Sequence, residues 1–285
     1  MDSYLPLYTI LYNNIGHSQL KTGNYTGALA SYSKALEDLD NTIVKSDVLA
    51  DQKTHLAQHI CATLNCIAVV KYHEYSRSTD DSDVELLDEV GELLAEALAI
   101  RATSGDMKQV LSRDTATILN NMGRYNFEKE EFAEALEFYK EAYECRRIIL
   151  GDNHSDVAAT LFNIAQTHAE LSNTTEAISS YKKFISIGIL TLGENHLDIS
   201  NVRFIVGQIC HNNNDLEGAF EQLTLALKSS RTTVGGPDDE TIALVSTSSA
   251  MYSTIRIIRK QPLTPMRKVS LWNGGSTQSI VNISL

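Results

Sequence analysis

The sequence has no apolar run long enough to cross a membrane, and it has few cysteines. None of its apolar stretches approaches the ~20 residues that a transmembrane helix needs. The four cysteines are Cys61, Cys66, Cys145 and Cys210, and no charged-then-apolar leader precedes them. This combination indicates reduced thiols rather than a disulfide framework, so we expect a cytoplasmic protein without a membrane partner.

Sequence motifs of common enzymes are also missing. There is no glycine-rich phosphate loop, no dinucleotide-binding fingerprint and no nucleophile elbow. His55 and His59 have a spacing that can chelate a metal ion, and Cys61 and Cys66 follow them closely. The two cysteines are five residues apart, however, so they share a helix face poorly, and packing or a solvated face is the better interpretation. We therefore expect no catalysis, no cofactor and no metal site.

What the sequence does contain is a stretch, residues 117–240, that repeats itself every 42 residues. Glycine or alanine, a second alanine, an aromatic or leucine residue, and a connector all recur at this interval. The recurring sets are Gly123, Ala165 and Gly207; Ala135, Ala177 and Ala219; Tyr139, Tyr181 and Leu223; and residues 150–154, 192–196 and 234–238. Self-similarity with a period of roughly 20 to 50 residues is typical of a repeat array.

Each copy contains two helical patterns and no strand pattern. In the first copy, one apolar stripe of an α-helix consists of Phe132, Ala135, Leu136, Tyr139, Ala142 and Tyr143. A second amphipathic run precedes this stripe, beyond a polar turn. We expect Gly123 to face the alanine column of the following helix, which would let the two helices approach closely. Because a helix pair buries only one face by itself, successive pairs must stack into a solenoid.

These residues resemble the tetratricopeptide repeat, in the 42-residue form of kinesin light chains and related adaptor proteins. The resemblance is carried by a short motif, three columns and two Leu-Gly-x-Asn-His connectors: residues 120–123, the columns that begin at Ala135, Tyr139 and Ala142, and the connectors that end at His154 and His196. It implies an all-α, right-handed superhelical solenoid of antiparallel helix pairs, with the first helix of each pair on the concave surface. We interpret the two connector histidines as residues that cap or bridge helix ends.

The same pattern organises the rest of the chain into one elongated array. After a lead-in of residues 1–6, it predicts repeats at about residues 7–39, 56–101, 116–150, 158–192 and 200–234. The second repeat is stretched, because Ala68 and Val90 are 22 residues apart where other repeats use 12. We place its ten extra residues in the inner turn, as an exposed polar loop at residues 76–83.

The composition changes after Glu240. Residues 241–285 contain five bases and no acid, so the preceding residues are more negative than the whole-chain charge of −12 by five, at −17. Residues 241–260 could form a helix that caps the open end of the stack, and Pro262 and Pro265 would stop it. We expect residues 261–285 to be a basic, weakly ordered tail.

The non-apolar face of each first helix provides the candidate site. Asparagine occupies one position of this face in three of five copies, although it forms helices less well than lysine or glutamate by a few tenths of a kcal/mol. Its amide can donate to and accept from a peptide backbone. The predicted partner-binding residues are Asn14, Asn121 and Asn163 for the main chain, and His17, Arg124, Gln166 and Gln208 for side chains. The alternative is that the amides bond within the solenoid or to water.

These observations favour a non-catalytic scaffold or adaptor that binds a partner peptide or helix in the concave groove. A recognition or regulatory segment of a larger enzyme is one alternative. A nucleic-acid-binding helical repeat is another, but the acidic body disfavours it, because such binding depends on clustered lysine and arginine. A clamp for a terminal carboxylate is disfavoured too. Lys21 and Arg124 are the only permanent cations on this non-apolar face of the first helices, and Glu128 and Glu170 oppose them. A kinesin light chain joins its motor through a heptad coiled coil. This sequence has no sustained heptad pattern, so we expect no motor partner.

Overall fold

The computed structural model describes residues 7–45, 50–77, 83–103 and 111–232. Within these ranges it contains ten α-helices and no strand, so the predicted all-α class is confirmed. The helices form five antiparallel pairs: α1 (Leu7–Lys21) with α2 (Tyr25–Lys45), α3 (Ala50–Tyr75) with α4 (Asp83–Thr103), α6 (Arg113–Glu128) with α7 (Phe132–Leu150), α8 (Ser155–Glu170) with α9 (Thr174–Leu192), and α10 (Leu197–Asn212) with α11 (Leu216–Thr232).

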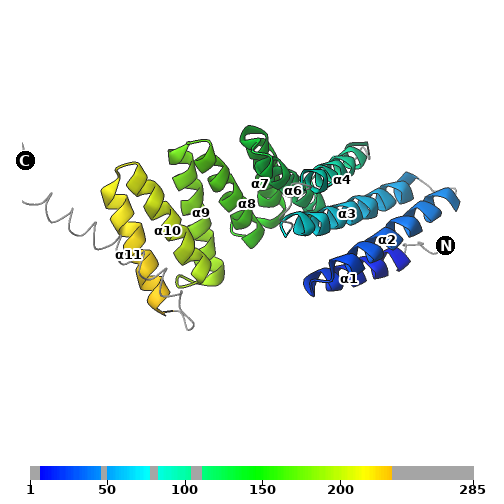
Figure 1. Cartoon of the computed structure of the whole chain (residues 1–285), viewed down its shortest axis with the longest axis horizontal. Helices are drawn as coiled ribbons and strands as arrows, with labels where there is room; N and C mark the ends of the chain where they lie inside the picture. Colours follow the sequence, from blue (N-terminus) through cyan, green and yellow to red (C-terminus); the bar gives the residue numbers. More distant parts are fainter. Residues whose placement is uncertain (1–6, 46–49, 78–82, 104–110, 233–285) are drawn as a thin grey trace, which may run out of the picture.

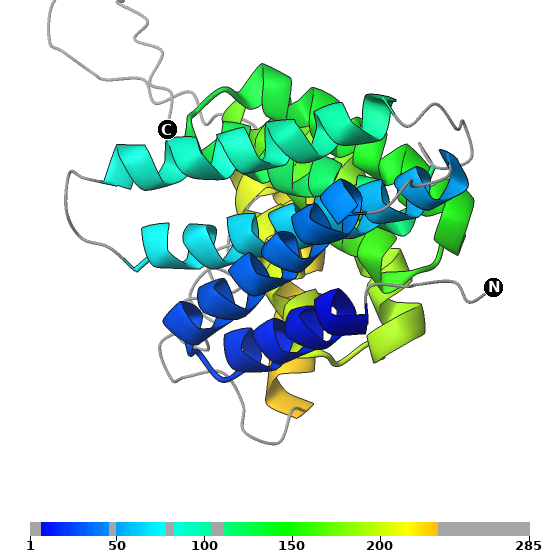
Figure 2. The same cartoon turned by 90° about the vertical axis from the view of Figure 1, so that its right-hand side faces the viewer.

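The pairs stack in chain order along one axis (Figure 1). Figure 2, a view along that axis from the α1 end, shows that the pairs change direction along the stack. Each helix packs on its partner and on the next helix of the chain, so the core is divided into several clusters strung along the molecule. The predicted solenoid is therefore confirmed. The predicted lead-in, capping helix and tail, residues 1–6, 241–260 and 261–285, lie outside the described residues.

The turn inside each of the four regular pairs contains one residue in the left-handed conformation. These residues are Gly23, Glu130, Ser172 and Asn214, with φ between +58° and +76°. In the third pair, the N–H of Glu131 donates to the carbonyl of Asn126 at 2.9 Å and that of Glu130 to the carbonyl of Phe127 at 3.0 Å, the two bonds of a Schellman motif. The turn reverses the chain within three residues, which places the two helices of a pair antiparallel.

The stretched pair, α3 and α4, distributes its ten extra residues over three places. Ala68 lies seven residues before the end of α3, whereas its counterpart Gly123 lies five before the end of α6. Val90 lies seven residues after the start of α4, whereas Ala135 lies three after the start of α7. The prediction that all ten residues lie in the turn is therefore wrong. Added helical residues satisfy their own backbone hydrogen bonds, and one of them, Tyr75 at the end of α3, packs against the core cluster of this pair.

The paired helices approach closely because of the predicted small residues. The nearest side chains to these small residues are those of the column that contains Tyr139. A Cβ added to Gly123 would lie 2.7 Å from the ring of Tyr139, and one added to Gly16 would lie 2.7 Å from the ring of Tyr32. The prediction that Gly123 faces the alanine column missed this nearer neighbour; at the equivalent Gly207, an added Cβ would lie 2.7 Å from Leu223 and 3.5 Å from the carbonyl of Ala219. Because a helical side chain leans toward the N-terminus of its helix, the large residue one turn after Ala135 covers the glycine.

Candidate functional site

The predicted binding residues all belong to first helices, and the first four of these helices, α1, α3, α6 and α8, form one layer. In addition to its neighbours in the chain, α3 contacts α1 and α6, and α6 contacts α8. Side chains on this face of successive repeats therefore lie side by side. Four of the predicted residues, Asn14, His17, Arg124 and Gln208, are exposed, and Gln166, Asn121 and Asn163 are half-buried.

Two of the predicted main-chain binders are hydrogen bonded to the preceding repeat. Asn121 Nδ2 donates to Asn65 Oδ1 at 2.8 Å, and Asn163 Nδ2 donates to Asn120 Oδ1 at 3.2 Å. Each acceptor stands one residue before the position that Asn121 and Asn163 occupy in their own helices. These bonds are the alternative that the sequence left open, in which the amides bond within the solenoid. Each bond uses one of the two N–H groups of the donor amide.

The first junction between repeats uses a different bond. Cys66 occupies the position of Asn121 there and cannot replace its amide. Asn13 Nδ2 instead donates to Thr63 Oγ1 at 2.9 Å. A side-chain hydrogen bond therefore connects neighbouring first helices at each of the first three junctions: α1 with α3, α3 with α6, and α6 with α8.

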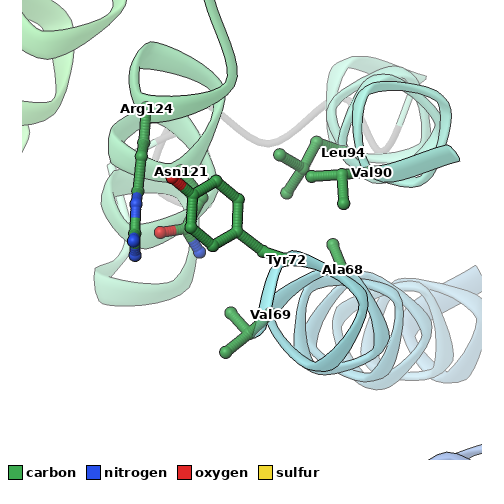
Figure 3. Close-up of a pocket in the computed structure, with 7 residues that line it drawn as sticks. All are labelled: Ala68, Val69, Tyr72, Val90, Leu94, Asn121 and Arg124. Carbon is green, nitrogen blue, oxygen red and sulfur yellow. The ribbon is translucent and has the colours of Figure 1, made fainter. Parts of the chain in front are cut away.

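Asn121 and Arg124 line a cavity between α3, α4 and α6 (Figure 3). Its volume is about 20 Å³, which is room for one water-sized group. The remaining lining residues are apolar or aromatic: Ala68, Val69, Tyr72, Val90 and Leu94. Figure 3 shows Asn121 and Arg124 of α6 on one side and Val90 and Leu94 of α4 on the other, with the α3 side chains between them. The structure thus brings together two of the predicted residues at a junction of two repeats.

A cation–π contact fixes the position of Arg124 at this cavity. Its guanidinium carbon lies 3.6 Å from the centre of the Tyr72 ring. The Tyr72 hydroxyl in turn donates to the carboxylate of Glu128. Desolvation, together with this hydrogen bond, raises the pKa of Tyr72 well above its ordinary 10.0, so the hydroxyl stays protonated and keeps its role as a donor.

The connector histidines cap helices, as predicted. His154 Nδ1 accepts a hydrogen bond from the N–H of Asp156 at 3.0 Å, at the start of α8. His196 Nδ1 accepts from the N–H of Asp198 at 3.3 Å, at the start of α10. Each ring satisfies one of the N–H groups that a helix leaves open at its first turn.

Two buried arginines that join repeats were missed from the sequence. Arg146 Nη1 donates to Thr160 Oγ1 at 2.7 Å and to the carbonyl of Asp156 at 3.0 Å. Arg101 Nε donates to Thr115 Oγ1 at 2.9 Å. The signal was present, because each arginine has a threonine 14 residues later. These pairs tie the end of one pair of helices to the start of the next.

The described residues contain no group of three or more His, Cys, Asp and Glu side chains that could hold a metal ion. Desolvation, with the nearby charge of His55, lowers the pKa of His59. All four cysteines are unpaired thiols. Among the helices within the described ranges, none is long and apolar enough to span a membrane.

Comparison with known families decides what these helix pairs are. Residues 10–37 and 114–189 match models described as tetratricopeptide repeat. These two segments are tetratricopeptide repeats. The matched segments fall on α1 and α2, and on α6 to α9. Tetratricopeptide repeats generally mediate protein–protein interaction, and the fold is typically non-catalytic.

Solved structures share the fold of this helical array. BtubC (BKLC) from P. vanneervenii has a TM-score of 0.59 at 18% identity, over 94% of this chain and 89% of that chain. A putative kinesin light chain from Podosopora anserina with nearly identical TPR-like repeats has a TM-score of 0.58 at 14% identity, over 80% and 97%. The pilF protein of Pseudomonas aeruginosa has a TM-score of 0.53 at 16% identity, over 90% and 93%. The predicted likeness to kinesin light chain repeats is confirmed at the level of the fold.

One curated relative matches part of the chain. The protein CTR9 homolog of Arabidopsis thaliana is 29% identical over 137 residues, which is 46% of this chain and 12% of the relative. The chain therefore spans only a small part of the length of that relative.

Proposed function

We propose that the chain is a non-catalytic scaffold or adaptor that binds an extended segment of a partner protein along its layer of first helices. One observation carries this proposal. Asn121 and Arg124, both predicted from the sequence to contact a partner, line the same cavity between two repeats (Figure 3). A cavity at a junction in this layer offers a partner side chain a place that a smooth helical face does not.

The charge state of Arg124 supports this proposal. Its guanidinium is exposed and forms no ion pair with another residue in the described part of the chain. The stack on Tyr72 orients it, which reduces the rotamer entropy that binding would otherwise cost. An oriented guanidinium that forms no ion pair suits a carbonyl acceptor on a partner.

The half-buried asparagines have two roles in this proposal. Their bonds to Asn65 and Asn120 hold neighbouring first helices at a fixed spacing. The remaining N–H of each amide is the group that would donate to the main chain of a partner. Asn14, which is exposed, would bind the same main chain at the α1 end.

The partner that the charge favours is a protein, with no nucleic acid and no membrane involved. The excess of acids would repel phosphate groups. We also propose a cytoplasmic location, which the four unpaired thiols support. Burial raises the pKa of the Cys61 thiol to about 11, so it stays protonated and unreactive near neutral pH.

The test is selection of binding peptides on the purified protein from a displayed library of random peptides, followed by measured affinities. Substitutions His17→Ala, Arg124→Gln and Gln208→Ala should each weaken binding of a peptide that spans the layer about five-fold, the loss of about one hydrogen bond. The control substitutions Glu137→Ala and Lys183→Ala change exposed residues of second helices and should leave the affinity unchanged. Equal affinities for both groups of variants would contradict the proposal.

A further inference from the structure

We propose that the outward face of α1 is an interaction surface for a second copy of this chain, with the two α1 helices packed antiparallel about a twofold axis. The face consists of four large apolar residues, here called the α1 stripe: Leu7, Tyr8, Leu11 and Ile15, which are 76%, 66%, 52% and 39% exposed. The stripe contains none of the predicted partner-binding residues, so this surface is separate from the one in the proposed function.

The α1 stripe points away from the rest of the array. Leu7, Leu11 and Ile15 follow each other at intervals of four residues, which places them on one side of the helix. Asn13, two residues after Leu11, donates to Thr63 of α3 and therefore lies on the side that packs against the array. Figure 2 views the stack from this end and shows α1 at its front. The stripe therefore forms the open end of the described helices.

In three other first helices, the positions of the α1 stripe are buried between repeats. The helices α6, α8 and α10 align with α1 on their small residue, which is Gly16 in α1 and Gly123 in α6. In this alignment the counterparts of Tyr8, Leu11 and Ile15 are all at most 9% exposed: Thr115, Ile118 and Met122 in α6; Val157, Thr160 and Ile164 in α8; and Ile199, Val202 and Val206 in α10. The three α10 residues share a core cluster with residues of the preceding second helix, α9. These positions are therefore the ones through which a first helix packs on another helix.

The charge of α1 favours a second copy of the chain over a charged partner. The helix contains no acidic residue, and its basic residues, His17 and Lys21, follow the stripe in the sequence. The whole chain has a net charge of −12, so most contacts between two copies would bring carboxylates together. Two α1 stripes meet without that repulsion and without burying an unpaired charge.

The two ends of the array differ, which favours contact between like ends. The helix α11 forms the other end of the described helices, and among its described side chains no large hydrophobic residue is exposed. A head-to-tail contact would therefore bury the α1 stripe against a less apolar surface, whereas an isologous contact buries it on both copies. In the antiparallel arrangement Leu11 faces Leu11 of the second copy. Leu7 then faces Ile15, because both lie four residues from Leu11.

The size of the α1 stripe predicts a weak dimer. The helix has 15 residues and is therefore ~22 Å long. One face of such a helix buries less than the ~800 Å² per partner of a standard interface. The dimer therefore dissociates in the micromolar range or above, and it exchanges with the monomer.

Sedimentation equilibrium of the full chain at concentrations up to about 500 µM measures this association. The wild type should approach the mass of a dimer as the concentration rises. Leu11→Glu and Leu11→Lys each place like charges opposite one another across the axis, and each should weaken association at least about ten-fold. An equimolar mixture of these two variants pairs opposite charges and should restore association. Leu190→Glu, at a 70% exposed position of α9, is the matched control and should associate as the wild type does.

Three results would overturn the proposal. A wild type that stays monomeric at every concentration would mean that another occupant, such as another segment of the same chain or a different protein, covers the α1 stripe. Dimers that persist in Leu11→Glu would place the contact elsewhere on the molecule. A mixture of the two charged variants that stays monomeric would exclude contact between two Leu11 side chains across a twofold axis. Circular dichroism melts verify that the variants remain folded, as their exposed positions predict.

Discussion

At the scale of single residues, the inner turns place residues other than glycine in the left-handed backbone conformation. Glycine adopts a positive φ readily and is present at Gly23. Glu130, Ser172 and Asn214 adopt the same conformation with a Cβ. A non-glycine residue in the left-handed region costs roughly 1 kcal/mol, and asparagine less than the others. The turn geometry is therefore imposed by the packing of the two helices that it joins.

This mismatch predicts that Ser172→Gly stabilises the protein. Relief of the left-handed strain is partly offset by the greater freedom of glycine in the unfolded chain, so we expect a gain of about 0.5 kcal/mol in the free energy of unfolding. Denaturant titration measures it. Ser179→Gly, at an exposed position inside α9, is the matched control and should lose about 0.5–1 kcal/mol. A loss at Ser172 as large as that at Ser179 would contradict the explanation.

The cap at the start of α8 gives a second prediction at this scale. His154→Ala removes the acceptor for the N–H of Asp156 and should destabilise the protein by about 1 kcal/mol. His154→Asn offers a side-chain oxygen at the same place and should recover most of that loss. Thermal melts of the three proteins measure the difference. Equal melting temperatures for the alanine and asparagine variants would show that the ring acts through packing and that the cap contributes nothing.

At the scale of helices and junctions, buried polar bonds connect one repeat to the next. The Arg146 guanidinium reaches from the end of α7 to Thr160 of α8, and the first helices are joined by the amides described above. A solenoid has no contacts between distant repeats, so its cooperativity depends on these interfaces. Hydrogen bonds that involve a charged group contribute about 1.5–3 kcal/mol, more than those between neutral groups.

A double-mutant cycle tests the junction between α7 and α8. Arg146→Met should cost about 2–4 kcal/mol, because it leaves the Thr160 hydroxyl and the Asp156 carbonyl without this donor. Thr160→Val alone should cost less. Their coupling energy, from denaturant titrations of the four proteins, should be about 1–2 kcal/mol. A coupling energy near zero would mean that the side chains contribute independently and that the bond does not join the repeats.

The sequence predicted the regular helices well and the stretched pair poorly, for a physical reason. Where columns recur every 42 residues, the apolar period of Ala135 and its neighbours determines which face is buried, and α6 to α11 follow it. In α3 and α4 no such column determines where ten further residues go. Six of them extend the two helices, and the packing of Tyr75 against the core cluster of this pair depends on tertiary contacts that the sequence pattern does not give.

The candidate site was predictable in part. Helical spacing was enough to place Asn121 and Arg124 on the same face, and the structure brings both to one cavity. The bond from Asn121 to Asn65 depends on the offset between neighbouring first helices, which a sequence spacing of 56 residues does not give. The cavity is lined by side chains of α3, α4 and α6, and which of these side chains meet becomes apparent only with the helices in place.

At the scale of the whole molecule, the array is elongated and acidic, with a formal charge of −12. This charge predicts no appreciable binding to single-stranded RNA. Titration of a labelled oligonucleotide should show negligible affinity at low salt, where electrostatic binding is strongest, and no change as the salt concentration rises. A micromolar affinity that falls steeply with salt would contradict the assignment of a protein partner.

The most direct test of the account is to map a bound peptide on the whole array by nuclear magnetic resonance. A peptide selected from the displayed library is added to the isotope-labelled protein, and the shifts of the assigned amides are recorded. The account predicts that the perturbed residues lie on α1, α3, α6, α8 and α10 and include Asn121 and Arg124. Perturbations confined to the second helices, α2, α4, α7, α9 and α11, would contradict it.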